Sequence, residues 1–451
     1  MACAILQALR GRRVALLDQG SQLAPLLAGF DRKGAHFETG LHYCASLGEG
    51  EPGAFMFKRL GMEVPVCPCE ADGYAEVRLL STGRHFQLAF GRERLISKVG
   101  EAFPEEKDGI VRFLDRMREE AAKSAFLNIQ NGDFSSTSLF EPWSSRTLQE
   151  ELDAHFASPE LRAILSTPTF LHGVPPDRIS FGLHSRITSS MYDSLWEIDG
   201  GGRTLIACFA QALERNGVEI LLNRKVIHLE VKDGTKLLHS ADGSVVAADE
   251  CISTVHAKDF LHIAPPGLYR GGYRARALKI PETPGFLSMY ALNTGESAHQ
   301  KNYFVLPELD FKRFPPEGPQ AAYHLNISGG TSQTAILIAL TPAAHGLSDH
   351  SLPGYRRRKT EVIQAHWEEF SSWCPELMNN LTLVASSTPA TQKHYTGYCG
   401  GYGLMHDVNH SPILPVTKIP GIFLGGQSVV APGILGTMIS AFLLDKLTQQ
   451  K

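Results

Sequence analysis

The first polar side chain with a chemical use is Asp18. It directly follows residues 14–17, a short apolar run typical of a buried parallel strand. At the end of the second strand of a nucleotide-binding βαβ unit, a carboxylate accepts hydrogen bonds from ribose hydroxyls. Aspartate is also common in turns at strand ends, so Asp18 alone leaves a nucleotide contact and a turn residue equally open.

A second candidate lies near the C-terminus, in residues 424–442, LGGQSVVAPGILGTMISAF. The pattern predicts a strand, a glycine-containing turn with Gln427, and a helix that begins near Gly433. A helix N-terminus offers free N–H groups and a positive dipole end, and glycines let an anionic or electron-rich ring approach the backbone closely. Taken singly, the same pattern also fits an ordinary strand, turn and helix.

His42, in the motif TGLHY, is the side chain with the best chemistry for proton transfer. The near-neutral pKa expected for a histidine suits a proton donor to carbon. A structural loop histidine is the simpler interpretation. Tyr402 and His406, in GGYGLMHD, are weaker candidates of the same kind.

The elements that must position these residues alternate between helix and strand. Residues 2–9 have apolar side chains on one helical face, Gly11 ends that helix, and the strand at residues 14–17 follows. A helix from Gly201, strands at 218–223 and 225–231, a meander to about 254, a strand at 421–426 and a helix at 433–447 repeat the alternation. Residues 76–200 are predicted to be mostly helical, and 265–395 mixed.

Composition excludes several classes of protein. The 451 residues are 43% hydrophobic, and Lys+Arg 43 against Asp+Glu 47 leaves a net charge of −4 without a basic stripe, which argues against nucleic-acid binding. The eight cysteines are scattered, which favours a reducing, cytoplasmic location over a disulfide framework. Cys67 and Cys69 lack a second ligand pair at zinc spacing, so we expect no metal site. The apolar C-terminal tract carries glycines, Pro432 and Gln427, so we expect no transmembrane span.

Taken together, these stretches resemble the phytoene desaturase-type flavoprotein oxidoreductases, in particular the branch of the retinol saturases and carotenoid isomerases. The resemblance runs nearly end to end. It is carried by RRVALLDQG, KGAHFETGLHY, GGGRTLIACFAQALERNGVEILLNRKVIHLEV, DECISTVHA and GIFLGGQSVVAPGILGTMISAF, in this order. TGLHY and GGYGLMHD point to the saturase branch.

The resemblance implies an α/β fold with FAD as cofactor. The expected architecture is a discontinuous Rossmann-type FAD-binding domain (residues 1–75, 200–264 and 396–451) that lacks its first strand. A mixed α+β substrate-binding domain (76–199 and 265–395) accompanies it. The residues that the resemblance assigns to FAD are Asp18 at the adenosine ribose, Val226 at the adenine, Gly426 and Gln427 at the ribityl and pyrophosphate region, Gly433 and Ile434 at the pyrimidine carbonyl, and Gly40 and Leu41 beside the isoalloxazine.

Two features depart from the family pattern. The turn G-x-G-x-x-G, which would bind the pyrophosphate, is absent, and we expect it and its strand to lie upstream of Met1. Ala24-Pro25 stands where the family commonly has Gly-Gly. Because proline lacks an N–H donor and alanine disfavours positive φ, the pair predicts a loss of phosphate contacts.

The reaction implied by the resemblance is hydride transfer between flavin and a carbon of an apolar polyene, leading to saturation, desaturation or isomerisation of C=C bonds. Such a substrate requires an apolar tunnel. Residues 126–129, 138–143 and 163–173 are candidates to line it, although plain core is the simpler interpretation. The resemblance specifies no electron donor or acceptor.

Two other functions stay open. A flavin amine oxidase would need an aromatic cage and a lysine near the flavin, which cannot be picked out here. A degenerate, cofactor-free protein that binds an apolar ligand or a partner is suggested by Ala24-Pro25 and the absent turn. Peripheral membrane contact through an amphipathic helix in residues 76–200 is a further hypothesis, because polyenes dissolve in lipid.

Overall fold

The computed structural model describes residues 1–124, 146–295, 299–310, 321–329, 333–410 and 413–449. Among the candidate tunnel segments, residues 126–129 and 138–143 therefore lie outside the described residues. The described chain combines short parallel strand pairs with one large mixed sheet and many helices, which confirms the predicted α/β class.

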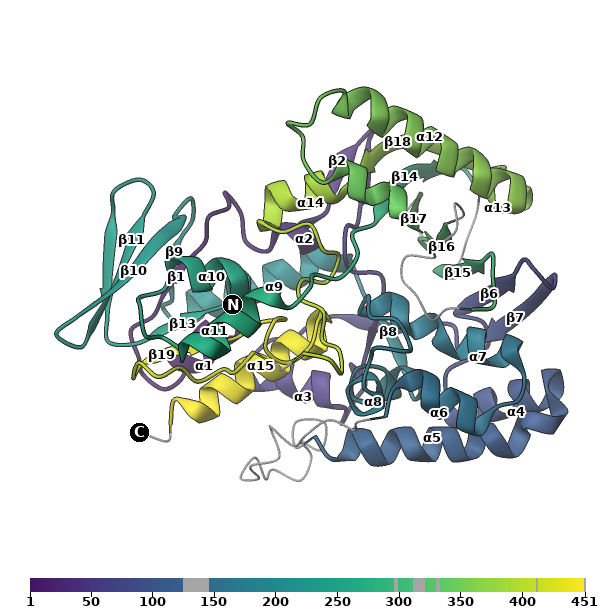
Figure 1. The fold of residues 1–451 in the computed structure, drawn as a ribbon, viewed down its shortest axis with the longest axis horizontal. Helices are drawn as coiled ribbons and strands as arrows, with labels where there is room; N and C mark the ends of the chain where they lie inside the picture. Colours follow the sequence, from purple (N-terminus) through teal and green to yellow (C-terminus); the bar gives the residue numbers. More distant parts are fainter. Residues whose placement is uncertain (125–145, 296–298, 311–320, 330–332, 411–412, 450–451) are drawn as a thin grey trace.

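The first half, for which the sequence predicts nucleotide binding, contains two separate pairs of parallel strands. β1 (Ala15–Leu17) pairs with β9 (Glu219–Leu221), and β13 (Cys251–Ser253) pairs with β19 (Ile422–Leu424). The helices of this half are α1 (Ala2–Ala8), α3 (Pro52–Arg59), α9 (Gly201–Arg215), α10 (Ala257–Ile263), α11 (Gly271–Lys279) and α15 (Gly433–Leu447). The antiparallel meander of β10 (Val226–Lys232), β11 (Thr235–Ser240) and β12 (Val245–Ala248) projects from the left of Figure 1.

The second half is built around a seven-stranded sheet, in which only the β6–β15 pair is parallel. Its strands, in order across the sheet, are β18 (Leu381–Ser387), β14 (Leu287–Asn293), β17 (Thr334–Leu340), β16 (Ala322–Ile327), β15 (Lys301–Leu306), β6 (Ala75–Leu79) and β7 (Arg84–Leu88). β6 and β7 thus join strands that follow them by more than 200 residues. The domain boundaries stay a prediction.

Helices flank this sheet in two groups (Figure 1). The long helix α12 (Tyr355–Trp373) packs against it with α13 (Pro375–Met378), and buried residues of β14, β16 and β17 share a core cluster with Phe370. The helical group is α4 (Arg92–Ala102), α5 (Lys107–Ala122), α6 (Leu148–His155), α7 (Pro159–Ser166) and α8 (Phe181–Thr188), with the 3-10 helices η1 (Pro104–Glu106), η4 (Thr167–Leu171) and η5 (Ser189–Tyr192).

The remaining described elements are short. They are α2 (Pro25–Ala28), the hairpin of β2 (Phe30–Arg32) and β3 (Ala35–Phe37), the small sheet of β4 (Cys44–Ala45), β8 (Leu195–Ile198) and β5 (Val66–Pro68), η6 (Pro342–Leu347), and α14 (Pro389–Thr396). Phe37 of β3 is fully buried and stacks edge-on against Tyr290 of β14, so the hairpin is anchored to the large sheet.

α5, an amphipathic helix within residues 76–200, has its apolar face buried in protein. Ile110, Phe113, Leu114 and Met117 of α5 lie in the core and pack with α4, α6 and α8, so this apolar face is closed to lipid. Within the described residues, no helix combines the length and apolar character needed to cross a bilayer.

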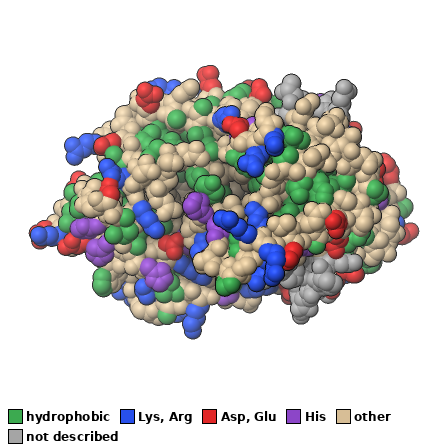
Figure 2. All heavy atoms as spheres, turned by 90° about the horizontal axis from the view of Figure 1, so that it is seen from above, with side chains coloured by type: hydrophobic (Ala, Val, Ile, Leu, Met, Phe, Trp, Pro, Cys, Tyr) green, Lys and Arg blue, Asp and Glu red, His purple; other side chains and the backbone are tan. Residues whose placement is uncertain are grey.

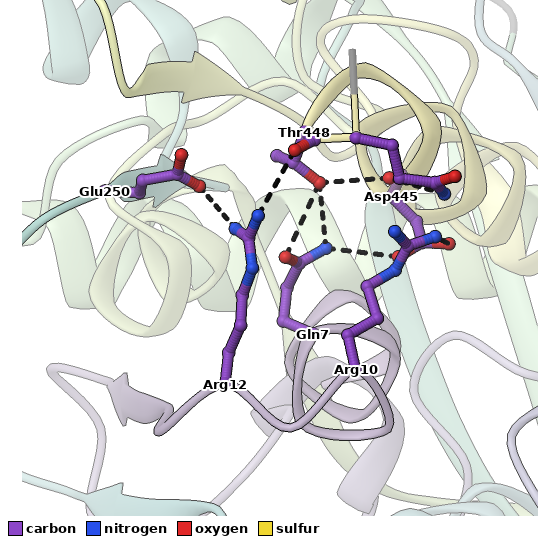
Figure 3. A network of polar contacts seen from close by, with 7 residues as sticks. Gln7, Arg10, Arg12, Glu250, Asp445 and Thr448 are labelled. Carbon is purple, nitrogen blue, oxygen red and sulfur yellow. Dashed lines mark hydrogen bonds and ion pairs between the residues drawn. The ribbon is translucent and has the colours of Figure 1, made fainter. Parts of the chain in front are cut away.

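A polar network ties the first helix to the last (Figure 3). The amide of buried Gln7 donates to Asp445 Oδ1 and to Thr448 Oγ1, each at 3.2 Å. Arg10 forms a two-pronged ion pair with Asp445, and Arg12 binds Glu250 at the start of β13. Because Arg12 leads into β1, the network links both parallel strand pairs to α15.

We predict that Gln7→Ala lowers the free energy of unfolding by about 1–2 kcal/mol, because buried hydrogen-bonding groups of Asp445 and Thr448 lose a partner. The same change at the exposed α9 position Gln211 is the control, expected within about 0.5 kcal/mol of wild type. Urea unfolding measures both. Equal stability of the two variants would show that the network does not hold α1 to α15.

Candidate active site

One large cavity lies between the seven-stranded sheet and the start of α15. Its volume is about 1320 Å³. One wall comes from the sheet strands β14, β15, β16 and β17, and the other from residues 39–45 and 429–439. Figure 2 shows a hollow near the middle of the upper face, with hydrophobic side chains inside it.

The N-terminus of α15 opens onto this cavity. No side chain caps the helix, and no acidic residue occupies its first turn. Gly433 is exposed with φ of 82° and has open space where a side chain would be, whereas Gly436 packs so tightly that a Cβ would lie 2.4 Å from the carbonyl oxygen of Ala431. The first N–H groups of a helix have no partner within it, so this turn presents free donors to the cavity.

The segment with Gly40, Leu41 and His42 forms the adjacent wall. Thr39 Oγ1 donates to the carbonyl of Leu26 at 2.8 Å, which holds the segment against α2. A Cβ on Gly40 would lie 3.1 Å from that same carbonyl, so glycine permits the close approach. The structure therefore brings Gly40, Leu41, Gln427, Gly433 and Ile434 to one cavity, as their assignment to a single cofactor requires.

Gly426 lies behind this wall. Its N–H donates to Ser440 Oγ of α15 at 2.9 Å, and its φ of 82° is the left-handed conformation that favours glycine. The neighbouring Gln427 does line the cavity, and its amide donates to the hydroxyl of Tyr398. Gly426 therefore holds the turn against α15 and does not itself line the cavity.

Asp18 directly follows β1, where its N–H donates to the carbonyl of Leu221 at the end of β9, and Val226 is the first residue of β10; neither residue is part of the described cavity lining. Asp18 Oδ1 accepts a hydrogen bond from Gly20 N at 2.7 Å, and the Asp18 carbonyl accepts one from Arg224 N at 2.8 Å. Ligands of open α/β sheets bind at the carboxyl ends of the strands, so the position suits the ribose role. The hydrogen bond from Gly20 shows that Asp18 also serves as a turn residue.

The environment of His42 differs from the sequence-based expectation. His42 is enclosed in the cavity wall, and burial lowers its pKa to about 4. The prediction of a near-neutral pKa was wrong because the burial of a loop residue is not visible in its neighbours in the sequence. At pH 7 the imidazole is neutral.

The two weaker candidates are also buried. Tyr402 lines the cavity, its hydroxyl donates to the carbonyl of Phe170, and burial raises its pKa. His406 contacts the carbonyl oxygen of Gln427 through Nε2 at 2.8 Å, and burial lowers the pKa of His406. These contacts suit a structural role in holding the 400–407 loop under the turn that carries Gln427.

His324 is the cavity residue that sequence reasoning missed. It lies on β16 and faces His42, with 6.1 Å between the ring centroids, and burial lowers its pKa to about 3. The sequence feature that could have identified it is the alternation in AYHLNI, in which the polar residues His324 and Asn326 interrupt an otherwise apolar strand. Both lie on the sheet face that includes the cavity.

Ala24 corrects a second expectation. It adopts φ of 45° and ψ of 60°, the left-handed conformation that alanine was expected to avoid, and Pro25 begins α2 directly after it. A left-handed non-glycine residue costs about 1–2 kcal/mol. The turn therefore keeps the backbone shape of a glycine turn at an energetic cost, although Pro25 still lacks an N–H donor.

Comparisons with known proteins identify the family. The family model of flavin containing amine oxidoreductases matches residues 2–441. The chain belongs to this family. All-trans-retinol 13,14-reductase of Rattus norvegicus is 22% identical, across 98% of this chain and 83% of the relative. A 4,4'-diapophytoene desaturase of Methylomonas is 22% identical across 58% of this chain and 52% of that protein.

Solved structures agree on the fold. An oxidoreductase from Methanosarcina mazei superposes with a TM-score of 0.71 at 12% identity, covering 99% of this chain and 97% of the other. The Rossmann-type class is thereby confirmed, and the cofactor of this FAD-dependent family member is FAD. The residues fit the group, since the uncapped first turn of α15 and the glycine backbone at Gly40 border one cavity.

Bound FAD supplies the hydride chemistry, and the chain supplies orientation and exclusion of water. The free N–H groups of Gly433 and Ile434 suit the stabilisation of negative charge on a reduced ring. Gly433 and Ile434 would act through their backbone N–H groups, which a side-chain substitution does not remove. Their role is therefore tested at Gly436, a residue that holds the turn in place.

We predict that Gly436→Ala weakens FAD binding at least about tenfold. The added methyl must displace the carbonyl of Ala431, which shifts the first turn of α15 away from the cavity wall. Gly271→Ala, at the start of α11 with open space around it, is the matched control and should retain FAD as wild type does. Flavin absorbance after gel filtration measures retention. Equal flavin content in both variants would contradict the role of this turn.

Proposed function

We propose that this protein is an FAD-dependent oxidoreductase that acts on an apolar polyene such as a retinoid or a carotenoid. The reaction would be the saturation, formation or isomerisation of C=C bonds. The observation that carries the proposal is the character of the cavity beside α15. Among its described lining residues, only Asp407 and Arg186 carry a formal charge. Asp407 is fully buried and is bound by Arg178 and by His410 Nδ1, so its charge is compensated.

The relatives support the same class of substrate. The names of the two curated relatives refer to the reduction of retinol and to the desaturation of 4,4'-diapophytoene. A long apolar molecule needs hydrophobic walls rather than charged clamps. Phe170 and Leu171, from the third tunnel segment predicted from sequence, are part of this wall.

The proposal assigns the contacts with FAD to eight residues, which lie in three places. Gly40, Leu41, Gln427, Gly433 and Ile434 would contact the ring and ribityl end within the cavity. Asp18 and Val226 would contact the adenosine end, and Gly426 would support the turn between them. His42 would be the proton donor to the substrate carbon opposite hydride addition.

A flavin amine oxidase is the second candidate, favoured by the description of the family. An amine substrate is a cation and calls for an unpaired carboxylate or an aromatic cage. The described cavity lining includes no lysine, and its carboxylate is already paired. The lack of a lysine and of an unpaired carboxylate in the described lining favours a polyene over an amine, whereas its aromatic side chains, among them Phe304 and Tyr402, suit either substrate.

We also propose a cytoplasmic protein that contacts membranes peripherally. The eight cysteines are free, which suits a reducing compartment. Among the residues lining the cavity, Tyr395 and Leu414 are 55% and 40% exposed, and such side chains at an opening would let an apolar substrate pass from lipid.

The direct test is anaerobic spectroscopy of the flavin-loaded protein. With the flavin reduced, a retinoid or carotenoid should restore the oxidised flavin spectrum while polyene absorbance falls; with the flavin oxidised, a saturated analogue should bleach it. An isomerase would change the polyene spectrum without net flavin turnover. Bleaching by amines, with no response to any polyene, would overturn the proposal in favour of the amine oxidase.

The pKa of His42 gives the proton-transfer step a signed pH dependence. Because the pKa of about 4 lies below the working range, the charged fraction rises about tenfold for each unit by which pH falls from 8 to 6. We predict that the rate of polyene reduction rises accordingly, and that His42→Gln flattens the profile. Burial of the neutral form also makes folding less stable below pH 6.5, so flavin retention is checked at each pH. A flat wild-type profile would exclude His42 as donor.

A further inference from the structure

A buried amide network stands behind His324. Across β15 and β16, Phe304 is opposite His324 and Asn302 is opposite Asn326. Asn302 Nδ2 donates to the carbonyl of Tyr74 at 3.0 Å. Asn302 Oδ1 accepts from Asn326 Nδ2 at 3.0 Å and lies 3.1 Å from His324 Nε2. All three polar side chains of this network are at most 6% exposed.

The network determines which nitrogen of His324 carries the proton. Asn302 Nδ2 donates to the carbonyl of Tyr74, which fixes the orientation of the amide and leaves Oδ1 facing His324. Because an amide oxygen can only accept a hydrogen bond, His324 Nε2 must donate. Burial keeps the ring neutral, which leaves Nδ1 as a hydrogen-bond acceptor. The described residues provide no hydrogen bond to Nδ1.

The position of the ring directs this acceptor toward a ligand. Phe304 stacks on His324 with 4.7 Å between centroids and an interplanar angle of 12°, and the His42 ring meets it edge-on at 6.1 Å. His324, Phe304 and His42 all line the cavity. A fixed acceptor is thus placed in a wall that is otherwise largely apolar.

We propose that His324 Nδ1 forms a hydroxyl-binding subsite, which accepts a hydrogen bond from an alcohol group of the apolar substrate. This inference rests on the proposed function, because it names the polar group of the same substrate. Asn302 is a positioning residue, which holds the imidazole in the accepting tautomer. The supporting amides Asn302 and Asn326 come from the buried interior of the sheet, so the ring is fixed before the ligand arrives.

The subsite discriminates by chemistry. An alcohol can donate to Nδ1, whereas its O-methyl ether has an oxygen of similar position without a proton to donate. A carboxylate likewise has no proton to donate to Nδ1 at neutral pH. We therefore expect the alcohol to bind about tenfold more tightly than the ether, which is uncharged and cannot pair with Arg186 of the cavity lining.

The experiment measures binding of a polyene alcohol, its methyl ether and the corresponding acid by quenching of protein fluorescence in the full-length, flavin-loaded protein. The alcohol-to-ether ratio of dissociation constants in the wild type requires no substitution. His324→Phe keeps a ring against Phe304 and should bring that ratio close to one. Tyr290→Phe removes a hydroxyl from another part of the cavity wall and should leave the ratio unchanged.

Each outcome has one interpretation. Equal affinity of wild type for alcohol and ether, or an unchanged ratio in folded His324→Phe, overturns the subsite. A tenfold ratio without any flavin turnover contradicts the proposed reaction and leaves the subsite intact. Turnover of polyenes with no preference for the alcohol contradicts the subsite and leaves the proposed reaction intact. Failure of all three ligands to bind contradicts both.

Discussion

The uncapped first turn of α15 is the constraint on which the rest of the structure depends. A helix that begins with free N–H groups beside a cavity requires either water or a ligand as partner. Keeping that turn in place requires close packing behind it, by Gly436 on Ala431 and by Ser440 on Gly426 N. At the other end of the helix, Gln7 and Arg10 bind Asp445, so α1 and α15 are held as one unit.

The seven-stranded sheet forms the cavity wall opposite α15, and its two faces have different contacts. On β16, Tyr323 points to α12, where its hydroxyl lies 2.8 Å from His366 Nδ1, while the next residue, His324, lines the cavity. This follows from the period of two in a strand. Tyr323 is thus hydrogen-bonded within the protein on one face, while His324 presents its ring to the cavity on the other face.

The sequence predicted local elements well and distant partners poorly. The helix at Gly433–Leu447 and the position of Asp18 after β1 are encoded by proline, glycine and apolar runs that lie next to one another. His324 was missed because its role depends on the pairing of β16 with β15, which carries Asn302, and on Tyr74, which precedes β6 in a distant part of the chain. The pKa of His42 was misjudged because its burial depends on tertiary structure, in which the His324 ring of the opposite wall lies 6.1 Å from the His42 ring. Ala24 was misjudged because the intrinsic preference of alanine for negative φ does not decide the conformation of this turn, whose next residues begin α2.

The most direct measurement is a crystal structure of the protein with FAD bound. The account predicts that the isoalloxazine ring lies in the cavity between Gly40–Leu41 and the first N–H groups of α15, with the adenosine ribose at Asp18. An isoalloxazine ring bound elsewhere, with the turn at Gly433 facing only solvent, would contradict it.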